Sequence, residues 1–176
     1  VAEIKETEMR RKARAPFTTS TLQQAASSQL GFAPARTMRT AQKLYEAGRI
    51  TYMRTDSTSV SSLAQAEALS TIKKMYGEKY AEGHIYKTKS KSAQEAHEAI
   101  RPTNPSLQKS GVTDEQIKLY GLIWRRFISS QMRDAEVLKT KITVKINDGA
   151  IVDFAAHGSR TIFDGWLVAD PAASGE

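Results

Sequence analysis

The sequence contains no cysteine, which excludes disulfide bonds and any metal site built on thiolates. A chain without disulfides fits a reducing compartment such as the cytoplasm. No apolar run approaches the roughly 20 residues that a transmembrane helix needs, and the opening lacks the features of a signal peptide. We therefore expect a globular protein that works without a membrane.

Aromatic residues are also scarce, at 7% of the chain, whereas the apolar fraction of 40% is enough for a packed core. This composition argues against wholesale disorder. A length of 176 residues can hold one large domain, or a small domain plus part of another. Because the chain opens without a methionine and ends in "ADPAASGE", we expect a piece of a longer protein.

Positive charge is concentrated in the first three quarters of the chain. The formal net charge is +7, and Lys and Arg outnumber Asp and Glu by 10 to 5 in residues 1–60 and by 12 to 8 in residues 61–135. Residues 136–176 carry 4 basic and 6 acidic side chains. A polyanionic partner such as nucleic acid is a reasonable expectation for the basic portion, although a basic surface that only confers solubility explains the charge alone equally well.

Apolar residues recur at helical spacing in four segments, which end at Gly31, Gly48, Gly77 and shortly after Ile128. Capping boxes are predicted at Ser20–Gln23 and at Thr113–Gln116. The last of the four helices has the strongest amphipathic pattern. A long polar connection, residues 78–110, separates it from the third helix.

The period changes after residue 137. Residues 138–146 alternate between apolar or Thr and Lys or Thr, which predicts a half-buried strand. The Asn147-Asp148-Gly149 sequence predicts a hairpin turn, residues 150–156 a second strand, and "RTIFDGW" a third. Residues 1–14 read as an arriving strand or linker. The fold class is therefore α+β, with a helical domain over residues 15–133 flanked by strands of an incomplete sheet.

The stretch "GRITYMRTDSTS" at residues 48–59 places a tyrosine and an arginine two positions apart. In an extended segment Tyr52 and Arg54 face the same side. A phenol beside a guanidinium suits a phosphodiester, because the phenolate can attack phosphorus while the arginine binds the non-bridging oxygens. Taken alone, the two residues are explained more simply as a buried strand tyrosine beside a solvated arginine.

Two further features are weak by themselves. Gln42 and Glu46 share a helix face near the turn that leads to Tyr52, but such a pair is usually only solvated. The segment "QEAHEAIRPT" contains His97, and a single histidine is more often a surface or capping residue.

Together, however, the motifs "PFTTSTLQQAAS", "QKLYEAGRITYMRTDSTSVS", "QEAHEAIRPT", "LYGLIWRRFISSQM" and "FDGW" resemble, in this order and spacing, the bacterial type IA DNA topoisomerases. The resemblance extends from Ala15 to Trp166. It implies that Tyr52 attacks single-stranded DNA and becomes bonded to the 5′ phosphate. Another strand then passes through the break, the break is resealed, and negative supercoils relax without ATP.

The resemblance also implies roles for the other residues. Arg54 would orient the scissile phosphate, and His97 would hydrogen-bond near it. The remaining candidates would line the site or the approach of the DNA: Gln42, Glu46, Thr51 and Asp56. Residues 1–14 and 134–176 would be segments of a β-rich hinge domain, with the helical domain, residues 15–133, inserted between them.

In the family, Mg²⁺ is bound by an N-terminal toprim domain, and this chain contains no Asp-x-Asp-x-Glu cluster. The resemblance therefore implies that the chain alone is inactive. Its expected partners are DNA, mainly single-stranded, and the remaining domains of the same protein. The expected location is the cytoplasm, with the nucleoid.

Two other classes of function compete with this interpretation. A non-catalytic module could bind single-stranded nucleic acid with Tyr52, Phe17 and Trp124 as stacking platforms. A phosphatase with a cysteine nucleophile is excluded by composition, and a tyrosine recombinase would need an Arg-His-Arg-Tyr set that is not spaced this way. A toprim domain in the same protein would favour the topoisomerase.

Overall fold

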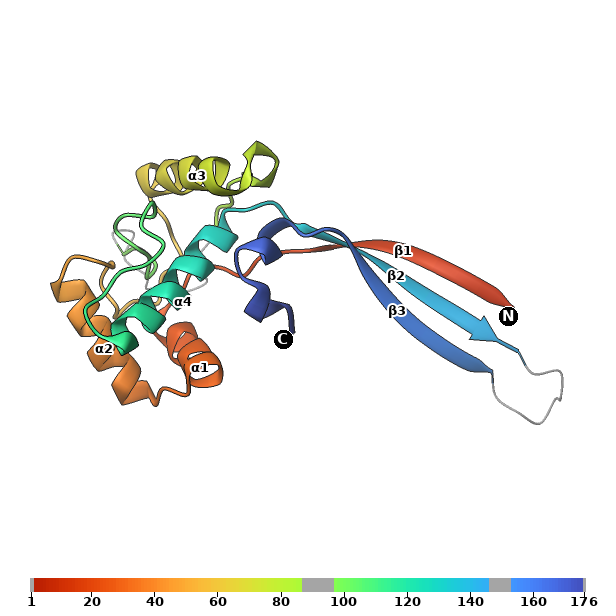
Figure 1. The fold of residues 1–176 in the computed structure, drawn as a ribbon, viewed down its shortest axis with the longest axis horizontal. Coiled ribbons are helices and arrows are strands. Elements are labelled where there is room, and N and C mark those ends of the chain that lie inside the picture. Colours follow the sequence, from red (N-terminus) through yellow and green to blue (C-terminus); the bar gives the residue numbers. More distant parts are fainter. Residues whose placement is uncertain (1, 87–96, 146–152, 176) are drawn as a thin grey trace. The chain divides into compact units, whose positions relative to one another are not determined.

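The computed structural model describes residues 2–86, 97–145 and 153–175. In these residues it contains four α-helices and one three-stranded antiparallel sheet (Figure 1), which confirms the α+β fold class. The chain divides into two compact units. The sheet unit comprises Val1–Lys12 and Asp134–Gly165, and the helical unit comprises Ala13–Arg133 and Trp166–Glu176.

The helical unit is organised around its last helix. The helices are α1 (Thr19–Leu30), α2 (Pro34–Glu46), α3 (Ser62–Tyr76) and α4 (Asp114–Ser130). Helix α4 packs against the other three and runs between α3 and the α1–α2 pair (Figure 1). The predicted apolar face of α4 is its buried face, since Ile123, Trp124 and Phe127 are fully buried. None of the helices in the described residues is long and apolar enough to cross a membrane.

The start of α1 differs from the prediction. The capping box consists of Thr18 and Thr21, because the Thr18 side chain accepts a hydrogen bond from the Thr21 amide and Thr21 reciprocates. The predicted pair, Ser20 and Gln23, is wrong. Thr18 has the extended backbone that a capping residue needs, and the residues after it are already helical.

At the start of α4 the structure contains one of the two hydrogen bonds of the predicted capping box. The Thr113 hydroxyl accepts from the Gln116 amide at 3.3 Å. The Gln116 side chain, however, accepts from the Val112 amide at 3.0 Å rather than from Thr113. The first of these bonds satisfies an amide that the first helical turn leaves without a helical partner.

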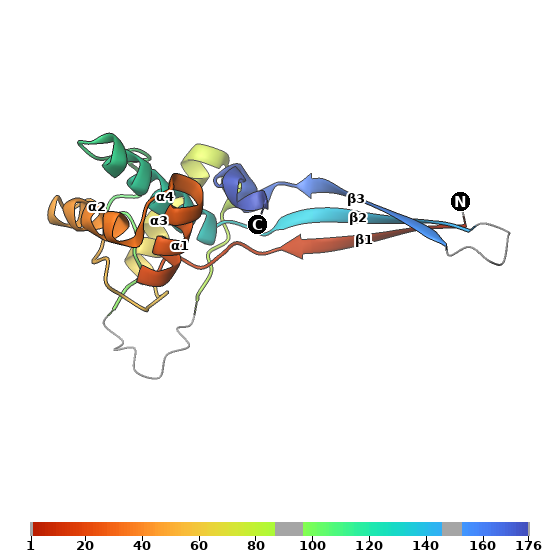
Figure 2. The ribbon, with the colours of Figure 1, turned by 90° about the horizontal axis from the view of Figure 1, so that it is seen from below.

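The sheet consists of β1 (Glu3–Arg11), β2 (Ala135–Val144) and β3 (Phe154–Phe163), with β2 in the middle (Figure 2). The predicted third strand at "RTIFDGW" is wrong. Its first four residues continue β3, and Gly165–Val168 is a 3₁₀ turn, so the third strand of the sheet is β1. The predicted hairpin turn at residues 147–149 lies outside the described residues.

The end of the chain packs with the helices, whereas the sequence pattern grouped it with the strands. Trp166 is 2% exposed, and its amide donates to the Arg133 carbonyl at 3.1 Å. The Arg125 guanidinium lies 3.7 Å from the buried Asp170 carboxylate. Burial of the indole, a large apolar surface, explains why the chain leaves the sheet after residue 163.

Candidate active site

Tyr52 lies in the loop between α2 and α3, and this loop is held by a second segment 50 residues further on. The Thr51 amide donates to the Arg101 carbonyl at 2.9 Å. The Thr51 hydroxyl donates to the Ala99 carbonyl at 2.7 Å and accepts from the Arg101 amide at 2.9 Å. Thr51 therefore fixes the segment from His97 to Arg101 beside Tyr52.

Helix α1 holds the other end of the same loop. The Thr19 amide donates to the Thr55 carbonyl at 2.9 Å. The Thr19 hydroxyl donates to the Met53 carbonyl at 2.7 Å and accepts from the Thr55 amide at 2.9 Å. Because the residues on both sides of Arg54 are bonded to Thr19, the backbone that carries Arg54 is fixed.

Side chains along this loop alternate between buried and exposed, although the loop is not a strand. Met53 and Ser57 are buried, whereas Arg54 and Asp56 are exposed. Tyr52 is 47% exposed. The two-residue spacing thus places Tyr52 and Arg54 on the solvent side of the loop, where a substrate can reach both.

Tyr52 and Arg54 line one cleft of about 340 Å³. Its lining residues are Thr51, Tyr52, Arg54, Thr55, His97 and Glu98. The cleft therefore combines a phenol, a guanidinium and an imidazole. These groups can attack a phosphorus atom, bind non-bridging oxygens through paired hydrogen bonds, and donate a further hydrogen bond.

The Tyr52 ring is supported by Tyr45, near the end of α2. The two ring centroids are 5.2 Å apart and the planes meet at 63°, an edge-to-face contact. Such contacts contribute about 0.5–1.5 kcal/mol beyond the area that they bury. Tyr45 is itself 41% exposed and limits the positions that the Tyr52 ring can take.

Glu98 is a residue of the cleft that the sequence did not single out. One carboxylate oxygen accepts from the Ser61 amide at 3.0 Å, and the other accepts from the Arg101 guanidinium at 2.7 Å. Partial burial alone would raise the pKa of Glu98, but the hydrogen bonds from Arg101 and Ser61 outweigh it and lower the pKa below its usual value. Glu98 therefore remains a carboxylate at neutral pH and is unsuited to donate a proton.

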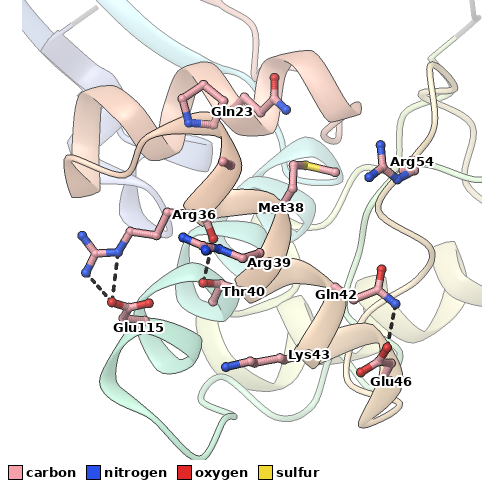
Figure 3. Close-up of a pocket in the computed structure, with 12 residues that line it drawn as sticks. Gln23, Arg36, Met38, Arg39, Thr40, Gln42, Lys43, Glu46, Arg54 and Glu115 are labelled. Atoms are coloured by element: carbon pink, nitrogen blue, oxygen red, sulfur yellow. Dashed lines mark hydrogen bonds and ion pairs between the residues drawn. The ribbon is translucent and has the colours of Figure 1, made fainter.

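A second and larger hollow, the α2 groove, shares Arg54 with the cleft. It has a volume of about 880 Å³ and is lined mainly by α2, with Gln42, Glu46 and Arg54 at one side (Figure 3). The Gln42 amide donates to the Glu46 carboxylate at 2.8 Å. Gln42 and Glu46 thus lie beside Arg54 rather than in the Tyr52 cleft, while Asp56 lines neither hollow.

The α2 groove is basic, which the sequence reading missed. Arg36, Arg39 and Lys43 lie at positions i, i+3 and i+7 of α2 and line the groove together with Arg54. Arg36 pairs with Glu115 across the groove (Figure 3). Within the described residues no salt bridge neutralises the other three cations. The helical spacing of the cations was a signal in the sequence that could have found this groove.

The Tyr52 cleft does not fit a metal ion. Glu98 is the only carboxylate among the described residues that line it, and this carboxylate is already bonded to Arg101 and Ser61. Among the residues that the structure describes, no group of three or more histidines and carboxylates at ligand distance includes a residue of the cleft. A metal ion at the reacting phosphate would need ligands from outside this cleft.

The family model of DNA topoisomerase matches residues 1–176, and the chain belongs to this family, within the bacterial type IA group. It is 48% identical over 169 residues to DNA topoisomerase 1 of Streptomyces coelicolor, an alignment that covers 91% of this chain and 18% of that protein. For DNA topoisomerase 1 of Helicobacter pylori strain J99 the identity is 47%, over 85% of this chain and 22% of that protein.

A solved structure shows the same fold. Full-length topoisomerase I from Thermotoga maritima matches with a TM-score of 0.82 and 39% identity, over 95% of this chain and 28% of that chain. The chain spans about a fifth of the length of the curated relatives that it matches. The activity, substrates and partners of those complete proteins are therefore proposals for this chain.

Proposed function

We propose that this chain forms the tyrosine-bearing part of a type IA topoisomerase, which cleaves and reseals single-stranded DNA through a 5′-phosphotyrosine. The observation that supports this most strongly is the convergence of Tyr52, Arg54 and His97 on one small cleft. Residues 15–133 would be the mobile domain that carries the nucleophile, and residues 1–14 and 134–176 would belong to the hinge, although the segment Trp166–Glu176 is part of the helical unit. Acting on DNA, the protein would work in the cytoplasm, with the nucleoid.

The chemical step exchanges one phosphodiester for another. The Tyr52 phenol gives up its proton as its oxygen attacks phosphorus, the bond from phosphorus to the 3′ oxygen breaks, and the 3′ oxygen takes up a proton as it leaves. The new phosphotyrosine bond is similar in energy to the bond that was broken, so the reverse attack by the 3′ hydroxyl reseals the strand without ATP. Arg54 holds the non-bridging oxygens in a fixed orientation, and His97 donates a hydrogen bond to the phosphate.

The α2 groove supports this function because it is basic and meets the cleft at Arg54. A single strand lying along the groove would contact Arg39 and Lys43 through its phosphates and would reach the cleft beside Gln42 and Glu46. Phosphate contacts of this kind position a strand without reading its sequence.

The proton for the 3′ oxygen and the Mg²⁺ of the family are expected to come from a toprim domain. The cleft offers neither a spare carboxylate nor a neutral acid, since Glu98 is ionised and paired. We therefore expect the 176-residue chain alone neither to cleave nor to relax DNA. Incubation with supercoiled plasmid and Mg²⁺ checks this, and topoisomers produced by the chain alone would contradict it.

The alternative, a non-catalytic module that stacks bases on aromatic side chains, loses two of its three platforms. Phe17 and Trp124 are 0% exposed, and the Trp124 indole donates to the Pro105 carbonyl at 2.8 Å. Of these three only Tyr52 remains accessible, and it lies beside Arg54 and His97, with the Tyr45 ring in edge-to-face contact. The arrangement favours chemistry at a phosphate.

The test is Arg54→Lys in the complete enzyme that carries this chain. Lysine keeps the charge but loses the paired donors that align a phosphate. We expect cleavage to slow by about 10- to 1000-fold, which corresponds to about 1.4–4 kcal/mol of barrier, while single-strand affinity stays within about twofold. Single-turnover cleavage of a labelled oligonucleotide over a range of enzyme concentrations measures both the cleavage rate and the affinity for the single strand. Arg160→Lys, in strand β3, is the control, and equal rates for Arg54→Lys and this control would overturn the role of Arg54.

A further inference from the structure

One face of the sheet places three basic side chains in a row across all three strands. Lys5 of β1 is directly opposite Lys141 of β2, which is directly opposite His157 of β3. The next row on the same face is Thr7, Lys139 and Ser159. These six residues line a hollow of about 510 Å³, and we call them the lysine face. Figure 2 shows the three strands side by side.

The lysine face does not stabilise the sheet. Like charges directly opposite each other on neighbouring strands are destabilising, and Lys5 and Lys141 are such a pair. Both are exposed. No salt bridge to Lys5, Lys139 or Lys141 occurs within the described residues. The arrangement therefore calls for an anion from outside the chain.

Charge is divided between the two faces of the sheet. Side chains alternate between faces along a strand, so the register assigns each charged residue to one of them. The first face carries Lys5, Arg11, Lys139 and Lys141 against Glu3, and the opposite face carries Arg10 and Arg160 against Glu6, Glu8 and Glu136. The formal balance is 4 − 1 = +3 on the first face and 2 − 3 = −1 on the second. Of the four acids in the strands, three thus lie on the opposite face, and Glu3 alone shares a face with the lysines.

We propose that the lysine face binds the phosphate backbone of DNA, as a contact surface separate from the Tyr52 cleft. Lys139 and Lys141 are two residues apart on one strand, so their Cα atoms are roughly 6.6–6.8 Å apart, and each can meet a different phosphate. The hydroxyls of Thr7 and Ser159 beside Lys139 add hydrogen-bond donors for phosphate oxygens. The shared chemistry is the backbone, which both duplex and single-stranded DNA present.

This inference goes beyond the reaction at Tyr52, because cleavage chemistry uses none of these residues. It predicts binding that is independent of sequence and weakened by salt, since each lysine that meets a phosphate releases a counterion. The lysine face has no Phe, Tyr or Trp among its six residues, so it offers charge but little stacking. It is therefore suited to hold a DNA strand that is not being cleaved.

The test compares two double variants of the 176-residue chain. Lys139→Gln/Lys141→Gln removes two positive charges from the lysine face, and Arg10→Gln/Arg160→Gln removes two from the opposite face. Affinity is measured by fluorescence anisotropy with labelled 20-nucleotide probes of mixed sequence, one single-stranded and one duplex, between 50 and 200 mM salt.

We expect the lysine variant to bind roughly tenfold more weakly than the unmodified chain at 100 mM salt. The slope of log K against log salt should fall by about 1.4 for the single strand and about 1.8 for the duplex. The arginine variant should stay within about twofold on both probes. The melting temperature of the lysine variant should not fall, because the change relieves like-charge repulsion.

A loss with either probe that the arginine variant does not share supports the proposal, and the probe affected shows which form of DNA the face binds. Unchanged affinity of the lysine variant would overturn it, as would an equal loss in the arginine variant, which would show a general charge effect. This outcome is separate from that of the proposed function, because cleavage by the complete enzyme tests Tyr52 and Arg54 without reference to the sheet.

Discussion

The helical unit and the sheet unit are stabilised in different ways. The helical unit buries several large side chains completely, among them Trp124, Tyr120 and Phe127. Of the residues in the three strands, all of which the structure describes, only Ala135 is buried. The helical unit thus has a core of its own, whereas the sheet depends on its backbone ladder and on cross-strand pairs worth about 0.2–1 kcal/mol each.

This difference matters for function because the candidate site belongs to the unit with the core. Every bond that positions the Tyr52 loop joins parts of the helical unit: Thr19 of α1, Thr51 of the loop, and the segment 97–103. We therefore expect the cleft to keep its geometry when the sheet is altered. The sheet, which has little core to protect, can instead be specialised through the charges on its surfaces.

The strongest test of this comparison makes the same Leu→Ala substitution in each unit. Leu122 on α4 is 1% exposed, and Leu138 on β2 is only half-buried. Leu122→Ala should lower the free energy of unfolding by about 2–5 kcal/mol, since it leaves a cavity in a packed core. Leu138→Ala should cost about 1 kcal/mol or less. Urea unfolding followed by circular dichroism measures both, and similar losses would show that the sheet has a core after all.

A smaller effect tests how firmly the site loop is held. Glu98→Gln removes the charge that the Ser61 amide and Arg101 bind. At neutral pH the loss should be about 0.5–1.5 kcal/mol. Because the pKa of folded Glu98 lies below its usual value of 4.5, its contribution is present above that value and disappears as the pH falls through the folded pKa.

The variant and the unmodified chain should therefore have the same stability in strong acid and should differ at pH 7. Glu115→Gln is the matched control, since it breaks an exposed ion pair with Arg36 and should cost less. Thermal unfolding at several pH values gives the comparison. A Glu98→Gln penalty that is constant across the acid range would contradict the assignment.

The sequence predicted most of the helical unit because its signals are local. Helix α4 was predicted from apolar residues at helical spacing, and Pro34 and Gly31 mark a start and an end. One error lies where neighbouring residues give equally strong local signals. Residues 18–21 are all hydroxyl residues, so the sequence cannot say which one caps α1. The strand predicted at "RTIFDGW" ends early because Trp166 is buried among helices, a tertiary effect that alternation does not show.

Part of the candidate site was predictable because it also rests on a local signal. Tyr52 and Arg54 are two residues apart, and an extended backbone suffices to place them on one side. Glu98 was missed because its role depends on the Ser61 amide, 37 residues earlier. The position of Tyr45 against Tyr52 depends on how α2 and the loop meet, which no spacing encodes.

The central claim is that Tyr52 is the nucleophile, and the most direct measurement is the covalent adduct with a labelled single-stranded oligonucleotide. In the complete enzyme that carries this chain, Tyr52→Phe keeps the ring and its packing and removes only the attacking oxygen. We expect no adduct and nearly unchanged DNA binding, whereas Tyr45→Phe, which removes the neighbouring hydroxyl, should still form the adduct. Adducts at the normal level in Tyr52→Phe, or their loss in Tyr45→Phe alone, would show that another tyrosine attacks the DNA.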